Sequence, residues 1–95
     1  MTVGLLRIRL RLTSRSLKEK RTIVKSVVER VRTRFNASAA EVGDLDTWDS
    51  ATIAVAVVSN EAAHADAMLQ TIANYITAER VDAELLDIET ELISV

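Results

Sequence analysis

Apolar and polar residues alternate over the first twelve positions of the chain. Positions 6, 8, 10 and 12 hold leucine or isoleucine, and the three positions between them hold arginine. Side chains of a strand point to opposite faces in turn, so a period of two predicts a half-buried strand. One face of this strand is expected to be apolar and the other to carry the arginines.

A helical period replaces the alternation after residue 15. Ser16 followed by Glu19 has the spacing of a capping box, in which the two side chains bond backbone amides at the start of a helix. The apolar positions behind it recur at helical spacing and predict a helix ending near Arg34. These positions are Leu17, Val24, Val27, Val28, Val31 and Phe35.

The second half of the chain repeats the strand–helix–strand order. Residues 37–42 predict a short strand, residues 43–49 a turn, and the nearly continuous apolar residues 51–58 a central strand. Ser59 or Asn60 is expected to cap a second helix, and residues 86–92 alternate like a final strand. The second helix is expected to bury Ala65, Met68, Leu69, Ile72, Ala73 and Ile76.

This order of elements, βαββαβ, predicts an α+β fold of the ferredoxin-like type in a single domain covering residues 1–95. Right-handed crossovers would give an antiparallel four-stranded sheet of order 4-1-3-2 with both helices on one face. The first and last strands would then pair with three arginines facing three carboxylates. These are Arg7, Arg9 and Arg11 on one strand and Asp87, Glu89 and Glu91 on the other.

The composition argues against several classes of function and site. The chain has no cysteine and one histidine, so thiolate chemistry is excluded and we expect no metal site. Its N-terminus reaches arginine too early for a secretory signal, and its longest apolar run is too short to span a bilayer, so we expect a cytoplasmic protein. Glycine occurs only at positions 4 and 43, which leaves no phosphate-binding loop, and we expect no cofactor.

Charge is divided unevenly along the chain. The net charge of −2 combines +9 over residues 1–34 with −11 over residues 35–95. Such a division indicates either a surface that binds polyanions or ion pairs between the two halves. For the sheet arginines we favour ion pairs. The neighbouring Thr52, Ala54 and Ala56 could also let this face dock a second copy.

The first helix carries the candidate phosphate contacts. Its outward face is expected to hold Lys18, Arg21, Lys25 and Arg32, with Lys20, Arg30 and Arg34 flanking that face. Basic residues near a helix N-terminus oppose the helix dipole, so stability alone does not explain them. The loops at 13–16 and 43–49 and the loop after Arg80 should meet at one end of the sheet. They bring an arginine and the tryptophan to this end, where the tryptophan could stack on a base. The candidate nucleic-acid-binding residues are Arg15, Lys18, Lys20, Arg21, Lys25, Arg32 and Trp48.

Three alternatives concern the same end of the sheet. Trp48 could instead cover the open end of the core, while Asp44, Asp46 and Asp49 pair with the helix cations; we favour this packing interpretation for the tryptophan. The loop at 13–16 sits where acylphosphatase-like enzymes hold phosphate, although it lacks a glycine cradle. The carboxylates of the 41–49 region could attract magnesium, although no strict ligand spacing is present.

Three segments together resemble the bacterial YlxP-like family of unknown function. They are SLKEKR at 16–21, FNASAAEV at 35–42, and Asp46 and Trp48 before ATIAVAVVS at 51–59. The resemblance covers essentially the whole chain and implies a small ferredoxin-like cytoplasmic protein. It supplies no catalytic residues. It also implies work at the ribosome, because genes of this family often neighbour those of translation initiation and ribosome-binding factors.

We therefore predict a non-catalytic RNA- or ribosome-associated module whose first helix binds phosphates, with ribosomal RNA or the small ribosomal subunit as partner. The alternative is a homodimeric interaction protein that uses the open sheet face. Phosphate chemistry of the acylphosphatase type ranks third.

Overall fold

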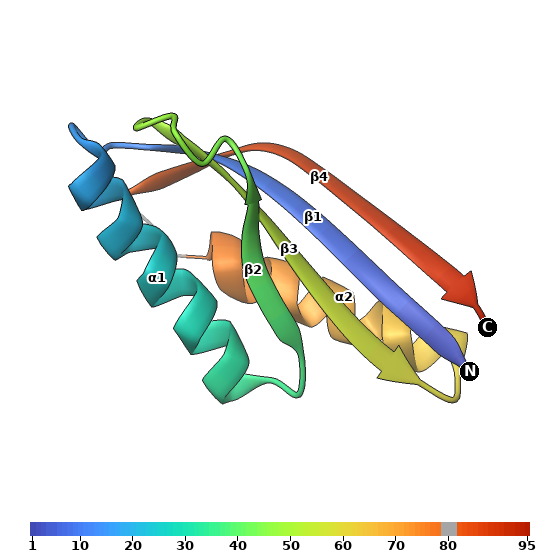
Figure 1. Cartoon of the computed structure of the whole chain (residues 1–95). Helices are drawn as coiled ribbons and strands as arrows, with labels where there is room; N and C mark the ends of the chain where they lie inside the picture. The colour runs from blue at the N-terminus through green and yellow to red at the C-terminus, as the bar shows by residue number, and fades with distance from the viewer. Residues whose placement is uncertain (79–81) are drawn as a thin grey trace.

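A computed structural model describes residues 1–78 and 82–95 of the chain. Four strands and two helices follow one another in the predicted order. They are β1 (Thr2–Leu12), α1 (Leu17–Arg34), β2 (Ser38–Gly43), β3 (Ser50–Ser59), α2 (Ala62–Thr77) and β4 (Ala83–Ser94). The strands form one antiparallel sheet of order β2-β3-β1-β4, and both helices lie on the same face (Figure 1). The predicted ferredoxin-like βαββαβ topology is confirmed.

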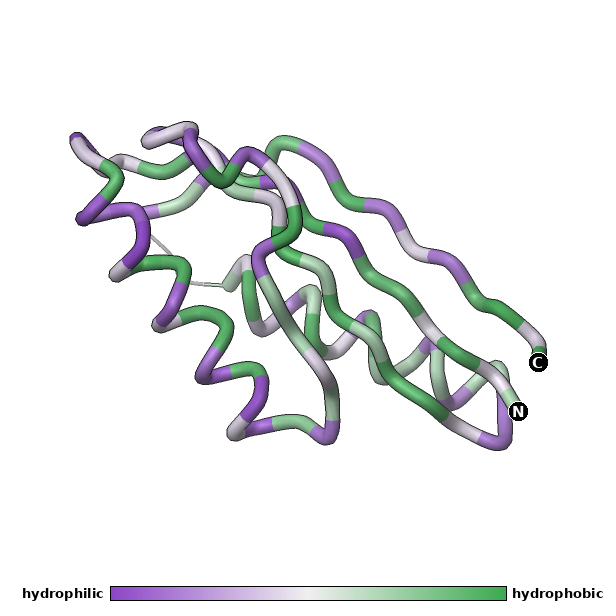
Figure 2. Tube along the Cα trace, in the orientation of Figure 1, coloured by the Kyte–Doolittle hydropathy of each residue, from purple (hydrophilic) through white to green (hydrophobic). Residues whose placement is uncertain are grey.

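The core lies between the sheet and the helices. The side chains of β1 at positions 6, 8, 10 and 12 are buried on the helix side, and the arginines between them are exposed on the open side. The same alternation is visible along β1 and β4 in Figure 2. The buried positions of α1 are mostly valines, which favour helices weakly, so packing on the sheet stabilises this helix.

Gly4 lets β1 and α2 approach closely. A Cβ atom at this position would lie 2.9 Å from Cγ2 of Val57 and 3.0 Å from Cδ1 of Leu69. Both of these side chains are buried in the core. The absence of a side chain at Gly4 is therefore what allows Leu69 to reach the sheet.

The start of α2 differs from the prediction. Its N-cap residue is Glu61, which makes no side-chain capping bond, whereas Ser59 or Asn60 was expected. The Ser59 hydroxyl accepts a hydrogen bond from the Glu61 N–H at 3.1 Å. Glu61 is the residue before the first residue of α2, so this bond does not reach an amide inside the helix. Because strand β3 continues to Ser59, α2 begins later in the chain than predicted, at Ala62.

The final strand is more exposed than its alternation predicts. The register with β1 shifts between Arg9 and Leu10, so Leu85, not Leu86, lies opposite Leu10. Leu85, Leu86, Ile88 and Leu92 are 37–44% exposed, because β4 is at the sheet edge. The edge position therefore leaves these apolar side chains of β4 only half covered, on both sides of the register shift.

The expected arginine ladder forms only in part. The guanidinium of Arg7 lies 3.4 Å from the Glu89 carboxylate, as expected. Arg9 is opposite Asp87 in the register, but its side chain pairs at 3.4 Å with Asp44. The register shift places Arg11 opposite Glu84, so a ladder with three cross-strand pairs does not form.

Candidate nucleic-acid interface

The start of α1 is fixed by the predicted capping box. The Ser16 hydroxyl accepts a hydrogen bond from the Glu19 N–H at 3.2 Å, and the Glu19 carboxylate accepts one from the Arg15 N–H at 2.7 Å. These two bonds satisfy amides that would otherwise lack partners at the helix start. They also hold the segment from Arg15 to Arg21 in one defined position at the end of the sheet.

Four of the predicted contact residues present their charges to solvent. Arg15, Lys18, Arg21 and Lys25 are all exposed, and the last three lie three and four residues apart on one side of α1. Lys25 lies 4.0 Å from Glu29, with both side chains more than half exposed, a geometry that contributes little. The other three form no ion pair with any residue the structure describes. We call these four residues the α1 basic row.

Lys20 does not belong to the α1 basic row, and the expectation that it flanks the outer helix face is wrong. Its side chain is fully buried. The ammonium Nζ lies 3.0 Å from Oε2 of Glu41 and donates a hydrogen bond to the Asp44 carbonyl. Oε2 itself is buried without a hydrogen bond of good geometry, so the Lys20–Glu41 attraction is mainly between charges. Lys20 therefore links α1 to β2 and to the turn that follows it.

Arg32 is also engaged within the protein. Its Nε and one terminal nitrogen donate to the carbonyl oxygen of Ala39, at 3.0 and 2.7 Å. Ala39 belongs to β2, one of the two edge strands of the described sheet. The guanidinium satisfies a main-chain carbonyl and fixes the C-terminal half of α1 against this strand. The side chain is exposed, but because two of its donors bond within the protein we leave Arg32 out of the α1 basic row.

The loops meet at one end of the sheet, as predicted. The Ser14 hydroxyl donates to the Trp48 carbonyl, the Leu12 N–H donates to Asp49 at 2.7 Å, and the Thr13 N–H donates to Asp82 at 3.1 Å. These bonds place the loop containing Trp48 next to the one containing Arg15.

The packing interpretation of this end of the sheet is wrong. Trp48 is 50% exposed and does not belong to the buried core cluster. The Asp44 carboxylate contacts Arg9 and the Thr52 hydroxyl, not the helix cations. The indole is therefore accessible in the loop beside Arg15, where it could stack on a base.

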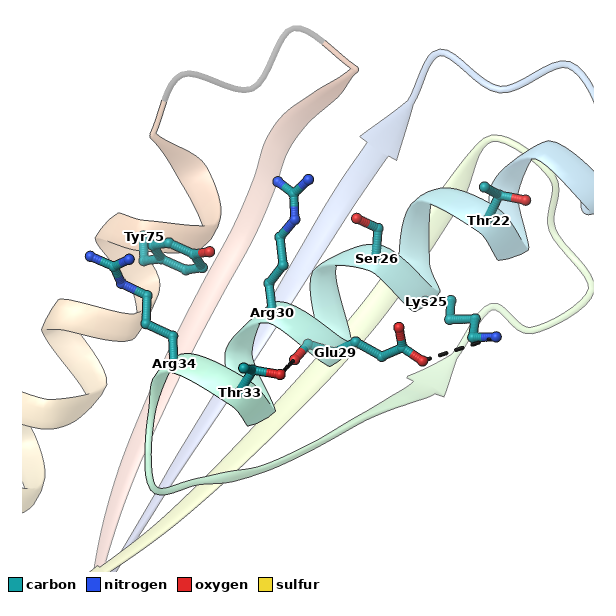
Figure 3. Close-up of a pocket in the computed structure, with 8 residues that line it drawn as sticks. All are labelled: Thr22, Lys25, Ser26, Glu29, Arg30, Thr33, Arg34 and Tyr75. Carbon is teal, nitrogen blue, oxygen red and sulfur yellow. Dashed lines mark hydrogen bonds and ion pairs between the residues drawn. The ribbon is translucent and has the colours of Figure 1, made fainter.

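A groove between α1 and α2, of about 720 Å³, continues the basic surface away from this end (Figure 3). Lys25, Arg30 and Arg34 line it from α1, and Tyr75 lines it from α2. The Arg34 guanidinium lies 5.0 Å from the centre of the Tyr75 ring, which also makes a T-shaped contact with the Phe35 ring. Arg30 forms no ion pair with a described residue. The sequence prediction missed this groove because Tyr75 comes from a different helix.

The magnesium and acylphosphatase alternatives gain little support from the described residues. No three histidine or acidic side chains cluster there in a way that would hold a metal ion. The Ser14 hydroxyl, in the loop compared with acylphosphatases, is hydrogen-bonded to a main-chain carbonyl. Neither described helix is long and apolar enough to cross a membrane. What the described residues do assemble is a cationic surface with the exposed Trp48 at one end and the partly buried Tyr75 at the other.

Residues 3–90 match the family described as "Protein of unknown function (DUF503)". The chain belongs to this family. Among curated proteins, the DUF503 chain is 38% identical over 61 residues to the uncharacterized protein YlxP of Bacillus subtilis (strain 168), a match covering 64% of this chain and 66% of the relative. The YlxP-like resemblance is thereby confirmed.

Among solved structures, the DUF503 chain is similar to a de novo designed protein with ferredoxin fold, solved by NMR in solution. The TM-score is 0.56, the sequence identity 18%, and the match covers all of this chain and 87% of the designed one. At this identity the similarity shows the fold alone.

Proposed function

We propose that this DUF503 protein is a non-catalytic RNA-binding module that associates with the ribosome and holds phosphates with the α1 basic row. The observation that carries the proposal is the exposure of Arg15, Lys18, Arg21 and Lys25 with almost no neutralising partner among the described residues. Cations that oppose the helix dipole and lack partners within the protein are best explained by an external anion.

Two aromatic side chains, the exposed Trp48 and the partly buried Tyr75, support RNA over a simple anion. Trp48 lies in the loop next to Arg15, and the groove containing Tyr75 and Arg30 lies along the same helix. A strand of RNA that follows α1 would meet phosphate-binding cations along the helix and a ring at each end. Single-stranded segments bind in this way, with stacking contributing affinity and cations following the backbone.

Salt dependence tests the proposal. Four phosphate contacts give a slope of log affinity against log salt of about −2.8 for single-stranded RNA. Between 50 and 200 mM salt, affinity should then fall about 50-fold. We expect co-sedimentation with small ribosomal subunits to follow this dependence. The variant Lys18→Gln, Arg21→Gln, Lys25→Gln should leave about one contact, with an affinity change of only about threefold over the same range.

The matched control is Ala67→Glu, Gln70→Glu, Asn74→Glu, which changes the net charge equally on exposed positions of α2. It should keep the wild-type salt dependence. Equal slopes for wild type and the α1 variant, or no binding of folded wild type at 50 mM salt, would refute the proposal. Light scattering on the same samples measures mass, and a dimer that does not bind RNA would support the alternative in which a second copy covers the open sheet face.

A further inference from the structure

The outer edge of β4 is the second surface whose chemistry the fold leaves unexplained. This strand of 12 residues pairs with β1 along one side and ends the sheet, so no described strand pairs with its other side. The main-chain N–H and C=O groups along such an edge are a template for another strand. Figure 1 shows β4 at the opposite side of the sheet from β2 and α1.

The helix-side face of β4 is apolar and only partly covered. Leu85, Ile88 and Leu92 lie opposite Leu10, Ile8 and Gly4 of β1, which are buried. The three β4 side chains are nevertheless 42–44% exposed. An additional strand beside β4, with apolar residues on the same face, would extend the core over them.

The open face of β4 is acidic. Its register places Glu84, Asp87, Glu89 and Glu91 on the same side as the β1 arginines. Only Glu89 forms an ion pair with a described residue, and that pair is exposed. Arg9, opposite Asp87, pairs elsewhere, and Glu91 lies opposite Leu5. This row therefore has more carboxylates than its neighbouring strand neutralises.

We propose that the β4 edge binds an extended segment of another protein in which lysine or arginine alternates with leucine, isoleucine or valine. Such a segment would add a fifth strand, with its basic residues facing the carboxylates and its apolar residues beside Leu85, Ile88 and Leu92. Strand β1 has this alternation in its RIRLRL sequence and pairs with the other side of β4. The proposed segment therefore has the same alternation of basic and apolar residues as the strand that already pairs with β4 on its other side.

A second copy of the chain does not fit this edge. Antiparallel pairing of β4 with its own copy would place the acidic rows on the same face and opposite one another. Like charges directly opposite each other in a sheet are destabilising. The basic strand that would suit the edge, β1, is central in the sheet and paired on both sides, so a folded copy cannot offer it.

One main-chain donor along the edge already has a side-chain partner. The Asp87 carboxylate accepts a hydrogen bond from the Ile88 N–H at 2.9 Å, which shows that this amide points away from β1. In the free protein the Asp87 side chain therefore occupies the Ile88 N–H, one of the main-chain donors of the edge. An arginine on the incoming segment can take over the carboxylate and release the amide for main-chain pairing.

The proposal concerns a surface separate from the α1 basic row. The test uses a labelled ten-residue peptide that alternates arginine with leucine and isoleucine, titrated by fluorescence anisotropy. Three opposite-charge pairs predict that Glu84→Gln, Asp87→Asn, Glu91→Gln weakens binding between about 3-fold and about 150-fold. The control Glu29→Gln, Asp46→Asn, Glu61→Gln removes as many carboxylates from exposed positions away from β4 and should leave affinity unchanged.

Two peptide controls separate strand pairing from simple charge attraction. A peptide of the same composition with its arginines grouped together, and one with alternate main-chain nitrogens methylated, should both bind at least tenfold more weakly. Amide exchange by NMR should slow at Ile88, Thr90 and Leu92 when the alternating peptide binds. Equal binding of the methylated peptide, equal loss in both carboxylate variants, or protection elsewhere would overturn the proposal.

Discussion

Replacing Lys20 with methionine tests the buried contact that links α1 to the β2–β3 turn. The substitution keeps an unbranched apolar side chain of similar length and removes the ammonium group. Glu41 then loses the cation 3.0 Å from its carboxylate, and the Asp44 carbonyl loses its donor from this side chain. The Asp44 carbonyl keeps the hydrogen bond that it accepts from the Thr47 N–H at 3.0 Å, so the loss falls mainly on the Glu41 carboxylate.

The magnitude follows from the burial of the two partners. Removing one member of a buried ion pair costs about 3–5 kcal/mol, because the remaining charge is left uncompensated. The Glu41 side chain is 17% exposed, so water can partly solvate it, and we expect the lower end, about 3 kcal/mol. For a domain of this size, that loss lowers the melting temperature by about 12–24 °C.

Urea unfolding followed by circular dichroism measures the free energy of unfolding of each variant. The control Arg21→Met changes the next residue, whose side chain is exposed, and should stay within about 0.5 kcal/mol of wild type. The double variant Lys20→Met, Glu41→Leu should recover most of the loss, since an apolar replacement of both partners is often neutral. A loss below about 1 kcal/mol for Lys20→Met alone would refute the reasoning from burial.

Two further substitutions test the packing and the cap. Gly4→Ala should lower the free energy of unfolding by about 1–3 kcal/mol, because its Cβ would press on the side chains of Val57 in β3 and Leu69 in α2. Ser38→Ala, at an exposed strand position, is the control. An unchanged unfolding midpoint for Gly4→Ala would contradict the close packing of these two side chains on Gly4. Ser16→Ala should cost about 1 kcal/mol through loss of the bond to the Glu19 N–H, with Ser16→Asp retaining it; equal losses in both variants would exclude a capping role.

The fold was predictable because apolar residues recur at regular spacings along its strands and helices. Alternation along β1, helical spacing along α1 and the capping box at Ser16 each agree with the structure. The failures fall where local spacing conflicts with residue type. Lys20 stands four residues before Val24 in the buried row of α1, yet its charge led to an outward assignment. Its burial depends on Glu41, a partner 21 residues away that no local pattern identifies.

The candidate site was predictable only on one helix face. The spacing of Lys18, Arg21 and Lys25 suffices to place them together, and the structure does so. The groove needed the packing of α1 on α2, which brings Tyr75 to Arg34. The register shift at Arg9 likewise depends on how two strands meet, so the pairing of Arg11 with Glu84 could not be read from either strand alone.

The opposite charges of the two halves have two separate consequences in the structure. Among the described residues, three ion pairs join the halves: Arg7–Glu89, Arg9–Asp44 and Lys20–Glu41. Internal pairing, one of the two interpretations of the composition, therefore applies to the middle of the molecule. The excess that remains is positive on α1 and negative on β4, at opposite sides of the sheet.

This separation restricts how partners can approach. A polyanion is attracted to α1 and repelled from β4, and a basic strand has the opposite preference, so the two proposed partners do not compete for one surface. Neutralising the β4 carboxylates should accordingly leave the RNA salt slope unchanged, and neutralising the α1 basic row should leave peptide affinity unchanged. A change in either crossed measurement would show that the two surfaces are not independent.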